Sequence, residues 1–178
     1  TSQMMILRPD NTVPIARQVA TRLSNQNLPL RLYYNQPIFR NQTSETHLET
    51  EVYQCGLELI GDESSSADAE ILNICIKTLK KLGLKDFQID IGHPDFIKPL
   101  STKKRQSLID GDFISLGYVP EIGTTKIIKN NKSLTSLYKK IKELKLEDYV
   151  QFNTGLVKDL HYYTGFIFEC YTKDTKQV

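Results

Sequence analysis

Several ingredients that mark particular classes of protein are scarce in this sequence. Its 178 residues contain no tryptophan, two methionines and three cysteines. The cysteines are Cys55, Cys75 and Cys170, an odd number with wide spacing and no CxxC pair. Neither a disulfide framework nor a thiolate metal site is therefore expected. We expect isolated, buried thiols in a reducing compartment.

Long apolar runs and an excess of one charge are also missing. No stretch approaches the roughly 18 apolar residues of a membrane-spanning helix. Residues 1–10 lack a basic end followed by an apolar stretch, so no secretory signal is expected. The net charge is +2, with 10 Lys and Arg against 12 Asp and Glu in residues 1–100 and 13 against 9 in residues 101–178. We therefore expect a cytoplasmic protein without a membrane or nucleic-acid partner.

The remaining composition is that of an ordinary globular protein, with 39% hydrophobic and 25% charged residues. Apolar residues recur at helical spacing over residues 13–23, 68–82 and 134–144. Strands are predicted at residues 30–35, 37–40, 51–60, 87–91 and 164–171. Residues 94–131 mix short apolar pieces with Pro, Gly and Lys, and we expect irregular structure there. Strands that follow one another without strict βαβ alternation favour an α+β fold with a mixed or antiparallel sheet.

The predicted strand over residues 51–60 is the first candidate for a binding surface. Because side chains alternate along a strand, Gln54, Gly56 and Glu58 share its polar face. A glycine weakens a strand unless something approaches its backbone closely. A polar ligand above Gly56 would explain the three residues, and a half-exposed strand with ordinary polar residues is the alternative.

Two further positions have a functional and a structural interpretation. Asp10 and Thr12 lie at a predicted junction between a strand and a helix, where they could hold an ammonium group or cap the helix. Arg40 ends a predicted strand, where it could clamp an anion or face solvent.

The histidines and the adjacent tyrosines are individually weak signals. His161 could be a base, a ligand or neither, and Tyr162 and Tyr163 would point to opposite faces of a strand. His47 and His93 have no partner at metal-ligand spacing, so no metal site is expected.

Taken in order, these segments resemble the catalytic core of class II histidyl-tRNA synthetases. The matching stretches are Leu7-Arg8-Pro9-Asp10-Asn11-Thr12, Arg31-Leu32-Tyr33-Tyr34, Pro37-Ile38-Phe39-Arg40, Gln54-Cys55-Gly56-Leu57-Glu58-Leu59-Ile60-Gly61, Ala67-Asp68-Ala69-Glu70-Ile71, and the segment from Val157 to Glu169. The resemblance implies a class II synthetase-like α+β fold, with a mixed, mainly antiparallel sheet flanked by helices. It also implies that residues 1–178 form part of such a core domain. The family's first motif would precede Thr1 and its third would follow Val178, and residues 99–123 contain a candidate join.

The sequence departs from the synthetase pattern where that family handles ATP. No arginine lies between Arg40 and Arg105, although the loop after Arg40 should carry cationic groups for the phosphates. Lys158 stands where the family has an arginine, so a bidentate fork is replaced by a point charge. Asp10 replaces a glutamate, and His161 replaces an aspartate.

By resemblance, the residues that hold histidine are mostly present. The implied histidine-binding set is Asp10, Thr12, Arg40, Gln54, Glu58, Lys158, Tyr162 and Tyr163. Asp10 and Thr12 would bind the ammonium, and the tyrosines would surround the imidazole. No catalytic residue, metal or cofactor is implied.

This combination resembles the regulatory subunit of short-form ATP phosphoribosyltransferase, a synthetase paralogue without aminoacylation activity. The resemblance implies that L-histidine is an effector and that the catalytic subunit is a partner. It further implies a dimer within a hetero-octamer, and feedback inhibition of the first step of histidine biosynthesis. A histidyl-tRNA synthetase with a divergent ATP loop is the alternative, and a synthetase-like module with another partner is a third hypothesis.

Overall fold

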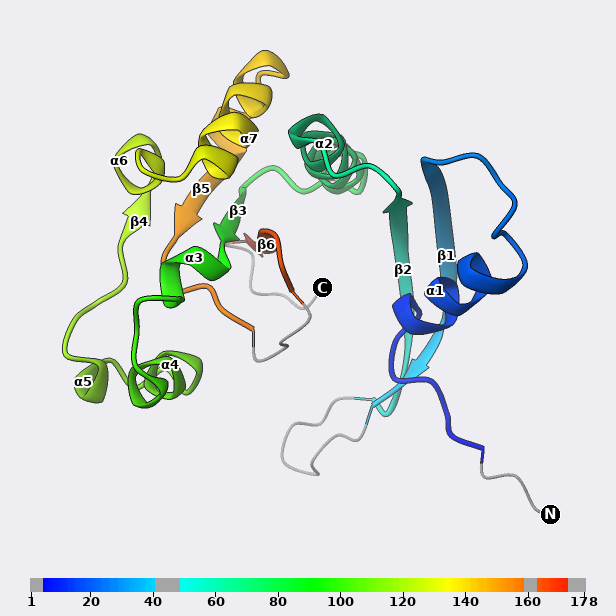
Figure 1. Ribbon diagram of the computed structural model, residues 1–178, viewed down its shortest axis with the longest axis horizontal. Coiled ribbons are helices and arrows are strands. Elements are labelled where there is room, and N and C mark those ends of the chain that lie inside the picture. Colours follow the sequence, from blue (N-terminus) through cyan, green and yellow to red (C-terminus); the bar gives the residue numbers. More distant parts are fainter. Residues whose placement is uncertain (1–4, 41–48, 159–162, 173–178) are drawn as a thin grey trace. The chain divides into compact units, whose positions relative to one another are not determined.

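The computed structural model describes residues 5–40, 49–158 and 163–172. The chain forms two compact units, residues 1–63 and residues 64–178. The first unit contains helix α1 (Thr12–Thr21) and strands β1 (Leu30–Phe39) and β2 (Glu51–Ile60), as Figure 1 shows. The two strands pair antiparallel along their whole length, from Leu30 opposite Ile60 to Phe39 opposite Glu51. The predictions of a helix over residues 13–23 and a strand over residues 51–60 are thus confirmed to within two residues at each end.

Strand β1 runs without interruption through Pro37, where the sequence predicts two strands on either side of Gln36-Pro37. Pro37 lies opposite Tyr53 of β2. Each strand of this two-stranded sheet has a single neighbour. A proline cannot donate a backbone hydrogen bond, but it is tolerated on an edge strand of this kind. The predicted break is therefore wrong.

The second unit combines a four-stranded sheet with several helices. The sheet has the order β4-β5-β3-β6, in which β3 is parallel to β5 and antiparallel to β6, and β4 is antiparallel to β5. Its elements are α2 (Ser65–Lys81), β3 (Phe87–Gly92), α3 (Pro94–Ile97), α4 (Thr102–Ile109), α5 (Phe113–Leu116), β4 (Ile122–Gly123), α6 (Thr125–Ile128), α7 (Lys132–Glu143), a 3₁₀ turn (Glu147–Tyr149), β5 (Val150–Asn153) and β6 (Ile167–Thr172). The predicted α+β class with a mixed, mainly antiparallel sheet is confirmed.

Helix α2 shows how the sequence sets an element's limits. The side chain of Ser64 accepts a hydrogen bond from the backbone N–H of Ala67, which caps the first turn. Lys80 and Lys81 lie in the last turn, where positive charge complements the helix dipole. Gly83 follows with φ of +92°, a left-handed conformation that glycine adopts at little cost. The helix begins three residues before the predicted start, because the serines are part of its first turn.

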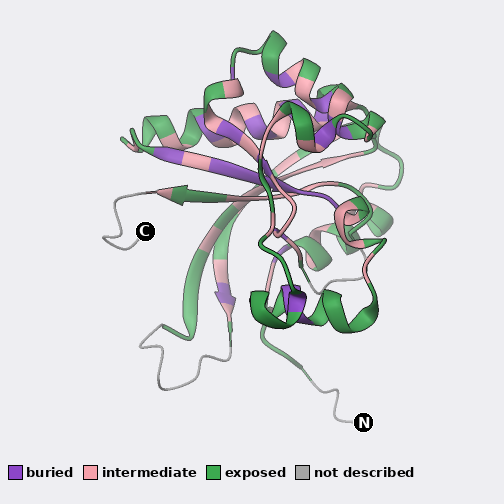
Figure 2. Ribbon diagram, turned by 90° about the vertical axis from the view of Figure 1, so that its left-hand side faces the viewer, coloured by how far each residue is buried: buried purple, intermediate pink, exposed green. Residues whose placement is uncertain are grey.

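The apolar core of the second unit lies between the sheet and helices α2 and α7. Alternate residues of β3 and β5 face this core, and Ile89, Ile91 and Phe152 are fully buried. In Figure 2 the buried residues gather on these same strands and helices. The core residues are Ala69, Leu72, Ile76, Phe87, Ile89, Ile91, Ile128, Leu134, Leu137, Ile141, Leu146, Val150 and Phe152.

Residues 94–131, which the sequence predicts to be irregular, contain four short helices and strand β4. Three of these helices have only four residues each, too few to show a helical period in the sequence. Local side chains cap three of the four helices: His93, Ser101 and Asp112 accept hydrogen bonds from the first turns of α3, α4 and α5, whereas α6 has no side-chain cap. The prediction of irregular structure is therefore wrong for most of this segment.

The cysteines differ in part from the expectation of buried thiols. Cys55 and Cys170 are exposed, Cys75 is half-buried, and all three are free. Among the described helices, none is both long enough and apolar enough to cross a lipid bilayer.

Candidate functional site

The polar face of the β1–β2 sheet carries two of the five predicted histidine-binding residues of the first unit, Gln54 and Glu58. Residues 8–12, which lead into the first turn of α1, are tied to this face by three side-chain hydrogen bonds. Arg8 donates to Gln36, Asn11 Nδ2 donates to Gln54 Oε1 at 3.3 Å, and Thr12 Oγ1 donates to Glu58 Oε1 at 3.0 Å. The structure thus brings Thr12, Gln54 and Glu58 together, although 42 residues separate the first two in the sequence.

The space above Gly56 is filled by Tyr34, its partner in the strand register. A Cβ atom added to Gly56 would lie 2.3 Å from the Tyr34 hydroxyl and 2.4 Å from Cζ. The glycine therefore makes room for this ring, where the sequence suggested room for a ligand. Tyr34 is a site residue that our sequence reasoning missed, because its place depends on which residues face one another across the two strands.

Two carboxylates act on the Tyr34 hydroxyl. Burial is the main cause that raises the pKa of Tyr34 above its usual value, followed by the negative charges of Glu58 and Asp10. Asp10 Oδ1 also accepts a hydrogen bond from the backbone N–H of Val13 at 3.4 Å, so it contributes to capping α1. Two carboxylates beside hydroxyl and amide oxygens form an environment that favours a cation.

Asn11 is the most deeply buried polar residue of this group, with 3% of its surface exposed. Its amide donates to Gln54 Oε1, which fixes the orientation of the Gln54 amide. Asn11 occupies the N-cap position of α1, but its side chain makes no cap hydrogen bond. A positioning role for Asn11 therefore becomes visible only in the structure.

Arg40 follows the last residue of β1. Its backbone N–H donates to the carbonyl of Thr50 at 2.9 Å, which continues the pairing of the two strands. Within the described residues its side chain forms no hydrogen bond or ion pair with Asp10, Thr12 or Glu58. The loop over residues 41–48, on which the predicted loss of ATP contacts rests, lies outside the described residues.

In the second unit, Lys158 forms an ion pair with Glu169 of β6. Tyr171 donates to the other oxygen of the same carboxylate at 2.7 Å. The hydrogen bond from Lys158, then that from Tyr171, lowers the pKa of Glu169. The same carboxylate raises the pKa of Tyr171 to about 12, with smaller contributions from burial and from Asp90. The positive charge of Lys158 is thus offset within its own unit.

A buried carboxylate lies next to this pair. Asp90 is opposite Glu169 in the β3–β6 register and is only 5% exposed. It accepts hydrogen bonds from Gln151 at 2.6 Å and from Asn153 at 2.7 Å, both on β5. The three side chains form a polar layer on the face of the sheet opposite the apolar core. Local sequence patterns give no sign of this cluster, because both donors lie about 60 residues away from Asp90 in the chain.

Tyr163 lines the same cavity of the second unit as Lys158. Tyr162 and His161 lie outside the described residues. No cluster of three or more His, Cys, Asp or Glu side chains that could hold a metal ion occurs in residues 5–40, 49–158 and 163–172.

Comparisons with known proteins identify the family of this chain. The family model described as histidyl-tRNA synthetase matches residues 1–108 and 121–178. The chain is 33% identical to an ATP phosphoribosyltransferase regulatory subunit from Halothermothrix orenii, covering 96% of this chain and 50% of the relative. It is 31% identical to a protein of the same name from Thermoanaerobacter pseudethanolicus, covering 96% and 55%.

A solved structure has the same architecture. A crystal structure from Bacillus halodurans, titled as an ATP phosphoribosyltransferase regulatory subunit/histidyl-tRNA synthetase, matches with a TM-score of 0.81 and 28% identity. The match covers 93% of this chain and 54% of that one. The chain thus spans about half the length of the relatives that it matches. Its sequence and its class II synthetase-like fold agree, and the chain belongs to the histidyl-tRNA synthetase family.

Proposed function

We propose that this chain is part of a non-catalytic regulatory subunit of short-form ATP phosphoribosyltransferase, and that it binds free L-histidine. In this proposal the protein acts in the cytoplasm in the first step of histidine biosynthesis. Histidine binding would report the level of the end product to the catalytic subunit. If one state of the assembly binds histidine more tightly than the other, histidine shifts the equilibrium toward that state. The shift in free energy equals the difference in histidine-binding free energy between the two states.

The observation that carries the proposal is the cation-favouring cluster of the first unit. Asp10 and Glu58 supply negative charge, while Thr12 and Tyr34 add hydroxyl groups beside them. An α-ammonium group and an imidazole N–H both need such acceptors. Thr12 uses one oxygen of Glu58, and the other oxygen has no hydrogen bond from the described residues. We assign that oxygen to the ligand.

The other predicted contacts stay part of the proposal. The resemblance assigns Lys158 and Tyr163 to histidine binding, together with Tyr162 and Arg40. Each offers a donor or a ring suited to the carboxylate or the imidazole of histidine. These four assignments rest on the sequence motifs.

The relatives support the regulatory function over catalysis. The two curated relatives described above are both named ATP phosphoribosyltransferase regulatory subunit. The replacement of the family's arginine by Lys158 supports the same choice, because a lysine offers a point charge where adenylation would use a bidentate fork.

The partner proposed for this subunit is the catalytic subunit of short-form ATP phosphoribosyltransferase. We further propose that the regulatory subunit dimerises and that the two kinds of subunit form a hetero-octamer. The name shared by the relatives supports a catalytic partner. The stoichiometry rests on the resemblance of the sequence motifs.

The remaining candidate function is histidyl-tRNA synthetase activity. The family model and the joint title of the Bacillus halodurans structure favour keeping this candidate. It requires ATP contacts from the loop after Arg40, where the sequence has no arginine before Arg105.

Calorimetric titration of the full-length protein with L-histidine tests the proposal, followed by histidine-dependent ATP–pyrophosphate exchange on the same sample. We expect binding without exchange, and co-purification with the catalytic subunit. Glu58→Gln should weaken histidine binding by about tenfold to a hundredfold, because it removes one charge-assisted hydrogen bond. Glu51→Gln, on the opposite face of the same strand, is the matched control and should leave binding unchanged. Exchange above background would instead establish a synthetase, and absence of histidine binding would refute the proposal.

A further inference from the structure

A short segment between α4 and β4 places large apolar side chains on the surface of the second unit. Ile114 of α5 is 94% exposed, and Val119, which follows that helix, is 75% exposed. Phe113, Tyr118 and Ile122 are exposed as well. We name these five residues the α5 patch. Apolar side chains scattered singly over a surface are ordinary, whereas a group of them is typical of a site that binds a partner.

The backbone of α5 brings the members of the patch close together. The backbone N–H of Gly117 donates back to the carbonyls of Phe113 and Ile114, at 3.1 and 3.2 Å. Gly117 has φ of +81°, a left-handed conformation that ends the helix after a single turn. Tyr118 therefore follows directly after a turn that closes on Phe113, and residues 113–119 form one compact surface feature.

Contacts on the inner side of the segment hold the patch in place. Leu116 of the same helical turn is buried. The backbone N–H of Asp112 donates to the carbonyl of Ser107 in α4 at 2.8 Å. At the other end, the backbone N–H of Glu121 donates to Thr154 Oγ1 at 2.9 Å, and its carbonyl accepts from the backbone N–H of Thr154 at 3.0 Å. A surface that is already ordered loses less conformational entropy when a partner binds.

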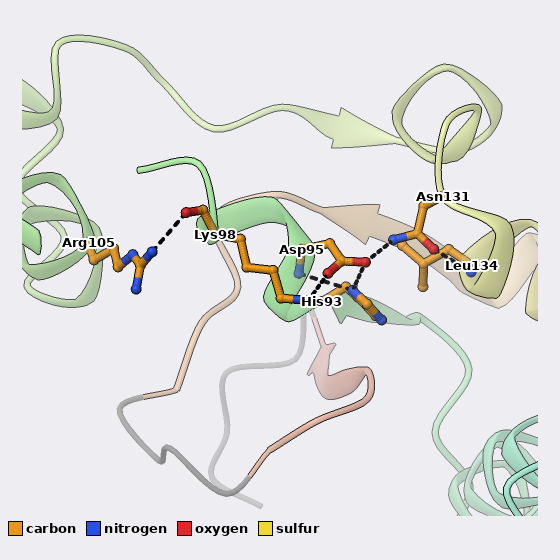
Figure 3. A network of polar contacts seen from close by, with 6 residues as sticks. All are labelled: His93, Asp95, Lys98, Arg105, Asn131 and Leu134. Atoms are coloured by element: carbon orange, nitrogen blue, oxygen red, sulfur yellow. Dashed lines mark hydrogen bonds and ion pairs between the residues drawn. The ribbon is translucent and has the colours of Figure 1, made fainter. Parts of the chain in front are cut away.

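Helix α4, from which the segment extends, is itself fixed to its neighbours, as Figure 3 shows in part. Arg105 Nη2 donates to the carbonyl of Lys98 at 2.8 Å, and its Nε donates to the carbonyl of Ile97 at 3.1 Å. Asp95 of α3 in turn accepts from Asn131, the cap of α7, at 2.8 Å. The patch is thus attached to the core of the second unit through α3 and α7.

The apolar residues of the patch lie among acidic ones. Residues 109–122 contain Asp110, Asp112 and Glu121 and no lysine or arginine. All three acidic residues are exposed, and none of them forms an ion pair with another described residue. The complementary surface is therefore apolar with lysine or arginine around it, because opposite charges guide and orient protein association.

This charge argues against the same patch of a second copy as the occupant. A two-fold axis places identical surfaces of the two copies against each other. Asp110, Asp112 and Glu121 would then face their own counterparts. Like charges brought together in an interface disfavour association. The occupant is therefore a different protein.

The segment also separates this chain from the synthetase family model. That model matches residues 1–108 and 121–178, and four of the five patch residues lie in the gap between the two ranges. A surface outside the shared synthetase core suits a task that synthetases do not have. We propose that the α5 patch binds the catalytic subunit of short-form ATP phosphoribosyltransferase, on an apolar surface of that subunit that basic residues surround. This inference rests on the proposed function and assigns the surface through which the partner is bound.

Biolayer interferometry of the full-length protein with the purified catalytic subunit tests the apolar part of this inference. We expect Ile114→Ser to weaken the complex by about tenfold, because the interface loses a buried apolar side chain. Leu82→Ser, at the end of α2, is the matched control, since Leu82 is 70% exposed and lies outside the patch. It should leave the affinity unchanged. An intact complex with Ile114→Ser, or equal weakening by both substitutions, would overturn the inference.

A second variant tests the charges. It combines Asp110→Asn, Asp112→Asn and Glu121→Gln, and the asparagine at position 112 keeps an acceptor for the cap of α5. We expect association to be about tenfold slower at low salt, and to depend less on salt concentration than it does in the unchanged protein. An unchanged association rate would mean that the partner surface is not basic, and would overturn the inference.

Two measurements on the protein alone test the other possible occupants. Urea unfolding of Ile114→Ser should keep the midpoint of the unchanged protein, as expected for an exposed position. A large decrease would mean that the chain itself covers the patch. Sedimentation velocity should show no self-association that Ile114→Ser abolishes, because such a change would assign the patch to a second copy. Either result would overturn the inference.

The failure of this inference can be distinguished from that of the proposed function. A complex that the patch variants leave intact would refute the inference alone, and the regulatory function would stand. If the unchanged protein forms no complex with the catalytic subunit, the proposed partner is wrong, and the inference is wrong with it.

Discussion

The hydroxyl of Tyr34 lies over Gly56, its partner in the β1–β2 register, where no other residue type would leave room for it. A methyl group at Gly56 would meet the Tyr34 Oη at 2.3 Å and Cζ at 2.4 Å. We therefore expect Gly56→Ala to force the ring aside and to lower the free energy of unfolding by about 1–3 kcal/mol. Urea unfolding followed by circular dichroism measures this change.

A double mutant identifies the cause of that loss. If the clash with Tyr34 is responsible, Gly56→Ala should cost much less in a Tyr34→Ala background, where the ring is absent. An equal cost in both backgrounds would mean that the backbone at Gly56, and not the tyrosine, requires glycine. Calorimetric titration of the same variants should show weaker histidine binding where the Tyr34 ring has moved away from Glu58.

The Tyr171 phenol should titrate far above a free tyrosine. Its hydrogen bond to Glu169 raises its pKa to about 12, because ionisation would place two negative charges side by side. Glu169→Gln removes one of those charges and should bring the pKa of Tyr171 back toward about 10. Titration of ¹³Cζ-labelled tyrosine by NMR resolves the individual phenols. Glu143→Gln, which alters an ion pair on α7, is the control and should leave Tyr171 unchanged.

The stability of the chain should decrease as the pH falls through the range in which histidine titrates. Burial lowers the pKa of His93, so the unfolded chain takes up a proton near pH 6.5 while the folded chain resists it. The free energy of unfolding contributed by His93 is present above that pH and is lost below it. We expect His93→Asn, which keeps a cap acceptor for α3, to flatten the slope of stability between about pH 7 and 5.5.

The slope of the unchanged protein provides the comparison for this experiment. Urea unfolding at a series of pH values gives the slopes. An unchanged slope in His93→Asn would show that His93 does not control the acid sensitivity.

Removing the buried carboxylate of Asp90 should destabilise the second unit. Asp90→Ala leaves the amides of Gln151 and Asn153 without their acceptor, because both donate to this one side chain. We expect a loss of about 1–3 kcal/mol in the free energy of unfolding. Asp86→Ala, at an exposed position just before β3, should cost less than about 0.5 kcal/mol. Equal effects of the two substitutions would contradict the structural role of Asp90.

Much of the secondary structure follows from local patterns. The alternation over residues 51–60 predicts strand β2 with its observed limits, and it places Gln54 and Glu58 on one face. The helical spacing over residues 68–82 and 134–144 predicts α2 and α7. These predictions hold because each element is long enough to show its period and to contain its own caps. The prediction for residues 94–131 is wrong for the opposite reason, because helices of one or two turns are too short to show a helical period in the sequence.

The sequence by itself determined the fold class, the family and the presence of carboxylates, hydroxyls and amides suited to histidine. Only the tertiary structure decided that Tyr34 covers Gly56 and that Asn11 orients Gln54. The same holds for the hydrogen bonds that Asp90 accepts from two side-chain amides of β5. The tertiary structure also decided that Lys98, Arg105 and Lys158 line one pocket. Each of these relationships joins residues that are distant in the chain. They depend on strand register and packing, which local periodicity does not encode.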